Sequence, residues 1–398
     1  MKKAPDIRFK DFTDAWEQRK VGDVLSENRD VGHSGDIAKK LTVKLWGKGV
    51  YAKDDKGSAA TQYFTRHAGQ FIYSKLDFLN SAFGVVPKEL ESYESTVDLP
   101  AFDCLGVEPY FMFYRAIQPS FYLTNGMIAD GSRKAKRIHV ETFLDMPLDL
   151  PSIEEQQKVA SYFIRLDTLI TLHQRKLEKL KLMKEAMLDK MFPKEGKNVP
   201  EIRIKGFTDD WEYKKLGTIA DKVTEKNAQR IYSETFTNSA EFGVISQRDF
   251  FDHDISNSEN IDGYYVVKEN DFVYNPRISV TAPCGPINCN RLGRSGIMSP
   301  LYTVFRTHDI DTLYLEWFFN SRCWHTFMYY NGDSGARSDR FSIKNDLFFN
   351  MPIPVPTIKE QKKIGEYLAN VNSTITLHQR KLEKLKQFKE AMLDKMFI

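Results

Sequence analysis

One stretch of twelve residues occurs twice in this chain, and it limits the possible folds more than any other feature. The segment ITLHQRKLEKLK spans Ile170–Lys181 and returns unchanged at Ile375–Lys386, 205 residues later. The segment KEAMLDKMF follows both copies at that same offset, at 184–192 and at 389–397. The chain therefore consists of two related units in tandem, and each ends in a long segment of nearly identical sequence.

A second repeat precedes each body of the chain. IRFKDFTDAW at Ile7–Trp16 matches IRIKGFTDDW at Ile202–Trp211, with an offset of 195 residues. We call these two stretches the lead segments. The sequences between a lead segment and the following long repeat are dissimilar. Nearly identical ends around dissimilar middles indicate shared mechanics with separate specificities.

Each long repeat begins with the signals of a helix start. Proline-rich extended segments, MPLDLP at 146–151 and MPIPVP at 351–356, disfavour helix. Ser152 and Thr357 then stand three residues before Glu155 and Glu360, the pattern of a capping box. We expect a helix of about 40 residues from each repeat, about 60 Å long.

Apolar residues recur in these helices at the a and d positions of a heptad, which predicts a coiled-coil seam. The predicted seam residues are Leu166, Ile170, His173, Leu177 and Leu180 in the first copy, and Ile375, His378, Leu382 and Leu385 in the second. The histidines, like Lys184 and Lys389, are polar interruptions that we expect to fix the register. A chain that leaves one body by the first helix brings the second helix back antiparallel, which predicts an intramolecular, pseudo-two-fold coiled coil.

The two bodies show short strand-like runs between turn signals. Such runs are Leu41–Trp46, Phe71–Tyr73 and Tyr110–Tyr114 in the first body, and 242–245, 264–267, 272–274 and 301–305 in the second. The bodies also align as distant copies, Gly69–Lys75 with Asn270–Pro276 and Phe83-Gly84 with Cys284-Gly285. The predicted fold class is α+β. The predicted segments are body one at 1–150, a helix with linker at 151–198, body two at 199–355 and a second helix at 356–398.

Composition excludes several classes of protein. Net charge is +3 and apolar residues make up 41%, so the bodies are folded and any surface for nucleic acid must be local. No apolar run approaches the about 20 residues that span a bilayer, and no apolar leader follows the start. Four cysteines do not form a disulfide framework, which favours reduced thiols in a cytoplasmic protein.

Motifs for catalysis are missing from the sequence. It has no GxxxxGK[ST] phosphate loop, no GxGxxG, no HExxH and no CxxC. Asn275-Pro276-Arg277 is the nearest approach to the motif of a DNA amino-methyltransferase, and it lacks the second proline and the aromatic residue. The acidic stretch with Asp249, Asp252, His253 and Asp254 is better explained as a solvated turn than as a metal site. We therefore expect binding chemistry, with no metal site.

Basic residues lie at related places in both bodies. Arg133–Arg137 and Arg337–Arg340 come just upstream of the final extended segment, Lys44–Lys48 and Gln247-Arg248 lie in an upstream pair of loops, and Arg291 and Arg294 add a basic stretch in the second body. Arginine and lysine hold phosphates, and arginine also reads guanine. The candidate DNA-binding residues are Lys44, Lys48, Arg133, Lys134, Lys136 and Arg137 in the first body, and Gln247, Arg248, Arg291, Arg294, Arg337 and Arg340 in the second. A short basic run is also typical of a solvated face, and only its occurrence in both bodies favours binding.

The lead segments, the proline-rich stretches before Glu155-Gln156 and Glu360-Gln361, and the twin HQRKLEKLK helices resemble the specificity subunits of type I restriction–modification systems. The resemblance covers the whole chain. It implies two target-recognition domains, each reading half of a bipartite, asymmetric site in double-stranded DNA, with the helices as spacer and docking surface. It also implies two modification subunits and restriction subunits as partners. S-adenosylmethionine, ATP and Mg would then bind those partners and not this chain, which is expected to be non-catalytic.

Two other functions remain open at this stage. A coiled-coil adaptor with protein ligands only would lack salt-dependent DNA binding. A stand-alone DNA methyltransferase would need the motifs that are missing here, and methylation by the purified chain without partners would support it.

Overall fold

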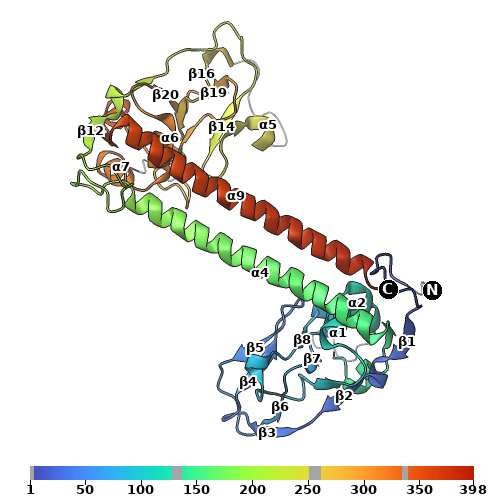
Figure 1. Ribbon diagram of the computed structural model, residues 1–398. Helices are drawn as coiled ribbons and strands as arrows, with labels where there is room; N and C mark the ends of the chain where they lie inside the picture. Colours follow the sequence, from blue (N-terminus) through green and yellow to red (C-terminus); the bar gives the residue numbers. More distant parts are fainter. Residues whose placement is uncertain (1–3, 128–136, 251–260, 334–338) are drawn as a thin grey trace. The chain divides into compact units, whose positions relative to one another are not determined.

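The structure is a computed structural model that describes residues 4–127, 137–250, 261–333 and 339–398 (Figure 1). It divides into two compact units. The first unit comprises 1–175 and 380–398, and the second comprises 176–379. Both contain sheets and helices, which confirms the α+β class. The predicted segments treated the long helices as separate from the bodies, whereas each compact unit contains part of both helices.

Two long helices, α4 (Ile153–Lys190) and α9 (Ile358–Lys395), have 38 residues each. They begin directly after Ser152 and Thr357, whose hydroxyl groups accept from the backbone N–H of Glu155 and Glu360 at 3.4 Å. The predicted helix starts are therefore confirmed. The glutamate side chains bind arginines of the lead segments, so among the described contacts only one half of each capping box forms.

In its described residues the first unit contains three sheets and three short α-helices besides its parts of the long helices. Its strands are β1 (Glu17–Lys20), β2 (Leu25–Asn28), β3 (Val31–Ser34), β4 (Lys40–Val43), β5 (Val50–Lys53), β6 (Gln62–Thr65), β7 (Phe71–Tyr73), β8 (Phe83–Val85), β9 (Glu94–Ser95), β10 (Ala101–Cys104) and β11 (Pro147–Leu150). Its helices are α1 (Pro109–Ala116), α2 (Pro119–Gly126) and α3 (Val140–Leu144), and Tyr114 of α1 packs against Phe163 of α4. Short 3-10 turns are η1 (Val21–Asp23), η2 (Phe78–Asn80) and η3 (Lys88–Leu90).

The second unit repeats much of this order. Its strands are β12 (Glu212–Lys215), β13 (Ala220–Lys222), β14 (Phe236–Ser239), β15 (Gly243–Ser246), β16 (Tyr265–Val267), β17 (Phe272–Tyr274), β18 (Ile287–Cys289), β19 (Gly296–Met298), β20 (Thr303–Thr307) and β21 (Pro352–Val355). Its helices are α5 (Gln247–Phe250), α6 (Thr312–Asn320), α7 (His325–Asn331) and α8 (Asn345–Phe349), with 3-10 turns η4 (Leu216–Thr218) and η5 (Ile261–Gly263).

A common frame is present in both units. The antiparallel pair β1–β11 corresponds to β12–β21, and the sheet β2-β10-β7-β8 corresponds to β13-β20-β17-β18. The units differ in what is added to this frame. The first has a five-stranded sheet of order β3-β6-β9-β4-β5, and the second has the two strand pairs β14–β15 and β16–β19. The dissimilar sequences between the repeats therefore build the parts that distinguish the units.

Aromatic residues from the helix ends complete the core of each unit. In the first unit, Phe397 lies 6.3 Å from Trp16 and 5.1 Å from Phe111 between ring centroids. In the second, Phe192 lies 5.6 Å from both Tyr314 and Phe318. Each body thus incorporates the KEAMLDKMF end of a long helix, which explains why both copies keep this sequence.

The Glu-Gln pair at the start of each long helix ties three segments together. Arg8 binds Glu155 through two hydrogen bonds of 2.7 Å, and the Glu155 side chain is 1% exposed. Gln156 donates to the carbonyl of Pro151 and accepts from the N–H of Glu108, which caps α1.

The second unit repeats these contacts. Arg203 binds Glu360 at 2.7 and 2.8 Å, and Gln361 contacts Pro356 and the N–H of Asp311. The lead segment, the proline-rich strand and the long helix are therefore joined in the same way twice.

The two long helices run antiparallel within each unit. In the first unit, Phe163 of α4 stacks on Phe397, while Asp167, one turn further along α4, binds Lys389, which comes earlier in α9. In the second unit, Lys184 donates to Asn372 at 2.7 Å, and Leu180 packs against Val371 and Ile375. The pseudo-two-fold relation of the units remains a prediction.

The predicted seam residues lie on the contacting faces. Leu166, Ile170, Leu180, Ile375 and Leu382 are buried, and Leu177, Leu385, His173 and His378 are partly buried. Both histidines have interaction partners. Lys184 and Lys389 use their ammonium groups inside the units, and burial lowers the pKa of Lys184. Burial and specific pairing of polar seam residues are what register-fixing positions require.

Two local predictions are wrong. Tyr110–Tyr114 belongs to helix α1, which starts at Pro109 with the Glu108 carboxylate accepting from the N–H of Phe111. The alignment of Phe83-Gly84 with Cys284-Gly285 is also wrong. Gly84 pairs with Ile72 of β7, and the residue that pairs with the equivalent Val273 of β17 is Asn288, so Gly84 corresponds to Asn288. The connection between these strands runs over 74–82 in the first unit and 275–286 in the second, so the second unit carries three additional residues there.

Other expectations concern what the chain lacks. All four cysteines are free, and Cys284 and Cys289 are buried. None of the helices in the described ranges is long and apolar enough to cross a membrane.

Candidate nucleic-acid interface

The turn between β4 and β5 presents an exposed tryptophan beside two lysines. Trp46 is 60% exposed and has a positive φ of 60°, a left-handed conformation that is unusual for a bulky side chain. The N–H groups of Trp46 and Gly47 donate to the carbonyls of Asn80 and Ser81 at 2.8 Å. These bonds hold the turn in place, so Trp46 faces solvent from a fixed backbone.

The two predicted lysines of this turn are exposed. The ammonium of Lys44 lies 4.2 Å from the centroid of the Tyr51 ring, a cation–π contact that leaves its charge available. Lys48 follows Trp46 by two residues. The aromatic ring and both charges therefore share one projecting turn.

The other basic candidates of the first unit are only partly described. Arg137 is exposed and stands just before the buried Ile138. Arg133, Lys134 and Lys136 lie outside the described residues.

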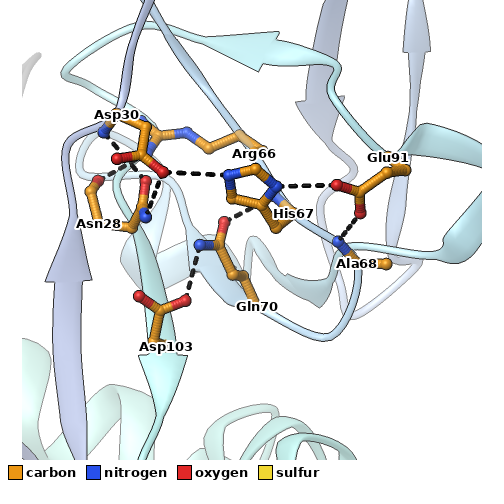
Figure 2. Close-up of polar contacts among 8 residues, drawn as sticks. All are labelled: Asn28, Asp30, Arg66, His67, Ala68, Gln70, Glu91 and Asp103. Carbon is orange, nitrogen blue, oxygen red and sulfur yellow. Dashed lines mark hydrogen bonds and ion pairs between the residues drawn. The ribbon is translucent and has the colours of Figure 1, made fainter.

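A second polar arrangement in the first unit surrounds His67 (Figure 2). The imidazole lies between Glu91, at 2.8 Å from Nδ1, and Asp30, at 3.0 Å from Nε2. Hydrogen bonding to Glu91 is the main cause that raises the pKa of His67, and Asp30 adds to it. The N–H of Ala68 donates to Glu91, and the N–H of His67 donates to Gln70.

Arg66 stands next to this histidine and is 2% exposed. Its guanidinium donates to Ser95 Oγ at 2.7 Å and to the carbonyl of Asn28 at 2.8 Å. Burial lowers the pKa of Arg66 to about 10, so the group remains charged at neutral pH. Because Arg66 and His67 are used in joining β2, β6 and β9, we assign this cluster to the stability of the unit and not to ligand binding.

The candidates of the second unit fall into two groups. Arg291 binds Glu316 at 2.8 Å, and Arg294 binds both oxygens of Glu234 at 2.8 Å. Their guanidinium donors already have carboxylate acceptors, so a DNA phosphate would have to compete for them. Arg291 and Arg294 remain predicted DNA-binding residues, but these ion pairs weaken the physical support for that role.

The other group borders a cleft. Gln247 and Arg340 both line a cavity of about 780 Å³ beside the β14–β15 hairpin. Arg248 is exposed next to Gln247 and has an interaction partner. Arg337 lies outside the described residues.

Sequence reasoning missed Arg277, which lines the same cleft. Arg277 and Arg340 are paired residues of an antiparallel bridge, and the backbone bonds Ile278 N–H to Asp339 and Phe341 N–H to Pro276 fix it at 3.0 and 2.8 Å. The two arginines are 63 positions apart in sequence, so no local pattern joins them. No sequence signal pointed to Arg277, because only the strand register shows that the 275–286 connection carries the additional residues.

Metal binding finds no support in this part of the chain. Among the described ranges, no group of three or more His, Cys, Asp and Glu side chains is arranged to hold a metal ion. The sequence candidates Asp252, His253 and Asp254 fall outside those ranges.

Comparisons with known proteins agree with this architecture. A family model described as "Type I restriction modification DNA specificity domain" matches residues 208–387, which contain most of the second body and of α9. The type I restriction enzyme MjaVIII specificity subunit of Methanocaldococcus jannaschii is 24% identical over 275 residues. These are 63% of this chain and 61% of that protein. The MjaX specificity subunit of the same organism is 24% identical over 314 residues, 72% of this chain and 67% of its own length.

A solved structure supports the fold over the whole chain. The S subunit of a type I restriction–modification system from M. genitalium has a TM-score of 0.51 with this chain at 9% sequence identity. The match covers 99% of both chains. The two curated relatives, in contrast, are matched over about two thirds of their length or less.

Proposed function

We propose that this chain is a specificity subunit of a type I restriction–modification system and acts as the DNA-reading subunit of such a complex, which its similarity to the family model and to the two curated relatives supports. In this role each compact unit binds one half of a bipartite, asymmetric site in double-stranded DNA. The chain itself is non-catalytic and selects the sequence at which partner subunits act.

The observation that carries this proposal is the division of each unit into a shared frame and a distinct addition. The frame repeats in strand order, in helix starts and in the Arg–Glu and Gln contacts of the long helices. The additions are a five-stranded sheet in one unit and two strand pairs in the other. Two different DNA sequences and one kind of partner require this combination of different surfaces on a common support.

The basic and aromatic groups on these additions supply the binding chemistry. Lysine and arginine bind phosphates, and exposed aromatic rings contact or stack on bases. The first unit offers Lys44, Trp46 and Lys48 on one turn, and the second offers Arg340 at a cleft.

The long helices act as spacer and docking surface in this proposal. A helix of 38 residues is about 57 Å long at about 1.5 Å per residue. Half-sites on successive turns of one DNA face lie about 34–36 Å apart, which such helices span with length to spare. We infer that two modification subunits dock here and methylate DNA with S-adenosylmethionine, and that restriction subunits supply the ATP- and Mg-dependent cleavage.

The test combines DNA binding with methylation mapping. The full chain, purified with the modification subunits of its own system, should bind duplex DNA with an affinity that falls steeply with salt, since each neutralised phosphate adds about 0.9 to the log–log slope. Mapping of methylated adenines in cells carrying the complex should give one motif in two parts with a fixed gap.

Each alternative function has its own outcome in this test. Absence of salt-dependent DNA binding would leave the coiled-coil adaptor. Methyl transfer by the purified chain in the absence of modification subunits would identify a stand-alone methyltransferase.

A further inference from the structure

The cleft of the second unit combines a rigid polar floor with two arginines whose side chains have no partner among the described residues. It lies between the β14–β15 hairpin, the 275–286 connection and Arg340. Both the hairpin and the extra length of that connection belong to the parts that distinguish this unit from the first. A surface built from those parts is where a unit-specific ligand is expected.

Side-chain amides fix the floor of the cleft. Asn238 donates to the carbonyl of Val273 at 2.7 Å and accepts from Asn288 at 2.7 Å on its side-chain oxygen. Asn275 donates to the carbonyl of Asn238 at 2.8 Å. Thr237 and Tyr302 share a hydrogen bond of 3.1 Å. These groups are engaged with the protein, so they shape the cleft and are not its binding groups.

Arg277 and Arg340 have the opposite character. Residues paired directly across an antiparallel bridge present their side chains on the same face, where two like charges destabilise each other. Within the described residues neither guanidinium forms an ion pair. Glu241 lines the same cleft but forms no ion pair with either arginine. In the same unit Arg291, Arg294 and Arg306 each bind a carboxylate. An anion between Arg277 and Arg340 relieves their repulsion and uses both sets of donors.

Buried polar groups beside the arginines also point to a polar ligand. Thr235 is 8% exposed and lines the cleft, and its hydroxyl has no hydrogen-bond partner among the described residues. The side-chain oxygen of Gln247, in the same lining, is likewise buried and without such a partner. Buried polar atoms are almost always paired in folded proteins, so two in one wall are exceptional.

We propose that this cleft is the DNA-binding site of the second unit, in which Arg277 and Arg340 clamp a backbone phosphate of the second half-site. The assignment rests on the proposed function and locates it within one unit. A phosphate held at the Arg277–Arg340 bridge fixes the register of the duplex against the β14–β15 hairpin. Thr235 and Gln247, which flank the hairpin and line the cleft, then supply polar groups for the base edges. DNA is favoured over a small anion because the surface extends along β14 and includes exposed Leu301 and half-buried Tyr264.

The test compares duplexes with the full chain in complex with its modification subunits. Once methylation mapping has given the site, three probes are used: the intact site, a duplex with the first half scrambled, and one with the second half scrambled. For Arg277→Ala/Arg340→Ala we expect the log–log salt slope to fall by about 1, because one phosphate is no longer neutralised. Affinity for the intact site should fall at least tenfold. Scrambling the second half should then have no further effect, while discrimination at the first half is kept.

Matched variants separate the clamp from general charge and from folding. Arg322→Ala removes an exposed arginine of the same unit that does not line the cleft, and it should leave the slope and both discriminations unchanged. Leu301→Glu adds a negative charge to the cleft wall at a side chain that is 61% exposed. It should weaken binding at the second half-site only, and it keeps the test decisive if the double variant does not fold.

The outcomes distinguish this inference from the proposed function. If the wild-type complex discriminates both halves and the double variant and Leu301→Glu do so equally well, the clamp assignment is wrong and the proposed function stands. If the wild-type complex shows no discrimination at either half, the proposed function itself fails. Tighter binding of inorganic phosphate than of duplex DNA, lost in the double variant, would identify a small-anion site instead.

Discussion

Removing Arg8 should destabilise the first unit strongly, because it leaves a buried carboxylate without its partner. Glu155 is 1% exposed, and Arg8 binds both of its oxygens at 2.7 Å. Breaking a buried ion pair by deleting one partner costs about 3–5 kcal/mol, mainly through the uncompensated charge. Arg8→Met keeps the volume and removes the charge, so we expect a loss of this size in the free energy of unfolding of the first unit.

The double variant tests the cause of this loss. In Arg8→Met/Glu155→Leu both charges are gone, and replacement of an entire buried pair by apolar residues is often neutral. The double variant should therefore be more stable than Arg8→Met by about 2 kcal/mol or more, so that the two single effects are clearly non-additive. Arg203→Met is the matched change in the second unit, whose Arg203–Glu360 pair has the same exposures of 13% and 1%.

The assay is native-state hydrogen exchange of the amides at the start of α4 and α9. This method resolves the two units, whereas a single unfolding transition is not assured for a chain of two compact units. Arg19→Met is the control, since Arg19 and Glu17 form an exposed pair worth about 1 kcal/mol or less. A loss of less than about 1 kcal/mol for Arg8→Met, or additive single effects, would refute the reasoning that Glu155 depends on Arg8 for charge compensation.

Three further predictions concern single positions. Lys184 is half-buried and donates to the amide of Asn372, whereas its counterpart Lys389 binds the carboxylate of Asp167. Asn372→Asp gives Lys184 such an ionised partner, so it should raise the pKa of Lys184 and stabilise the second unit by about 1 kcal/mol in urea unfolding. A loss of stability would contradict the pairing. The pKa of His67 is raised by Glu91 and Asp30, so its stabilising effect is complete below about pH 6.5 and is lost as the pH rises through the folded-state pKa. The difference in melting temperature between wild type and His67→Gln should therefore shrink as the pH rises above about 6.5, and a constant difference would show that His67 acts without its charge. Trp46→Ala should weaken binding to the first half-site at least fivefold without lowering the melting temperature, since the side chain is 60% exposed; unchanged affinity would remove this turn from the interface.

The sequence predicted those elements whose signals are local. Both long helices begin where a proline-rich segment meets Ser152 or Thr357 with a glutamate three residues on, and these signals all lie next to one another in the sequence. The strands β7 and β17 coincide with the predicted runs at 71–73 and 272–274, since these are buried and rich in aromatic and β-branched residues.

The errors arose where tertiary contacts decide the outcome. Tyr110–Tyr114 resembles a strand because its residues are almost all apolar, but Pro109 at the first turn and the cap from Glu108 start a helix that is buried along most of its length. The gap between β17 and β18 was misplaced because only the strand register shows where the three extra residues lie.

The candidate site was the least predictable part. Arg291 and Arg294 look as basic in the sequence as Arg340 does, yet their carboxylate partners, Glu316 and Glu234, come from 25 and 60 residues away. Only the fold shows which arginines such partners occupy. It also brings Arg277 next to Arg340, although their positions in the sequence are far apart.

Exchange of one body provides the most direct test of the claim that each unit reads its own half-site. Residues 224–350 would be replaced by the corresponding body of a similar specificity subunit, and methylated adenines would be mapped by single-molecule sequencing in cells with the same modification subunits. The account predicts a two-part motif in which one half changes while the other half and the gap stay the same. A contiguous motif, or a change in both halves, would contradict it.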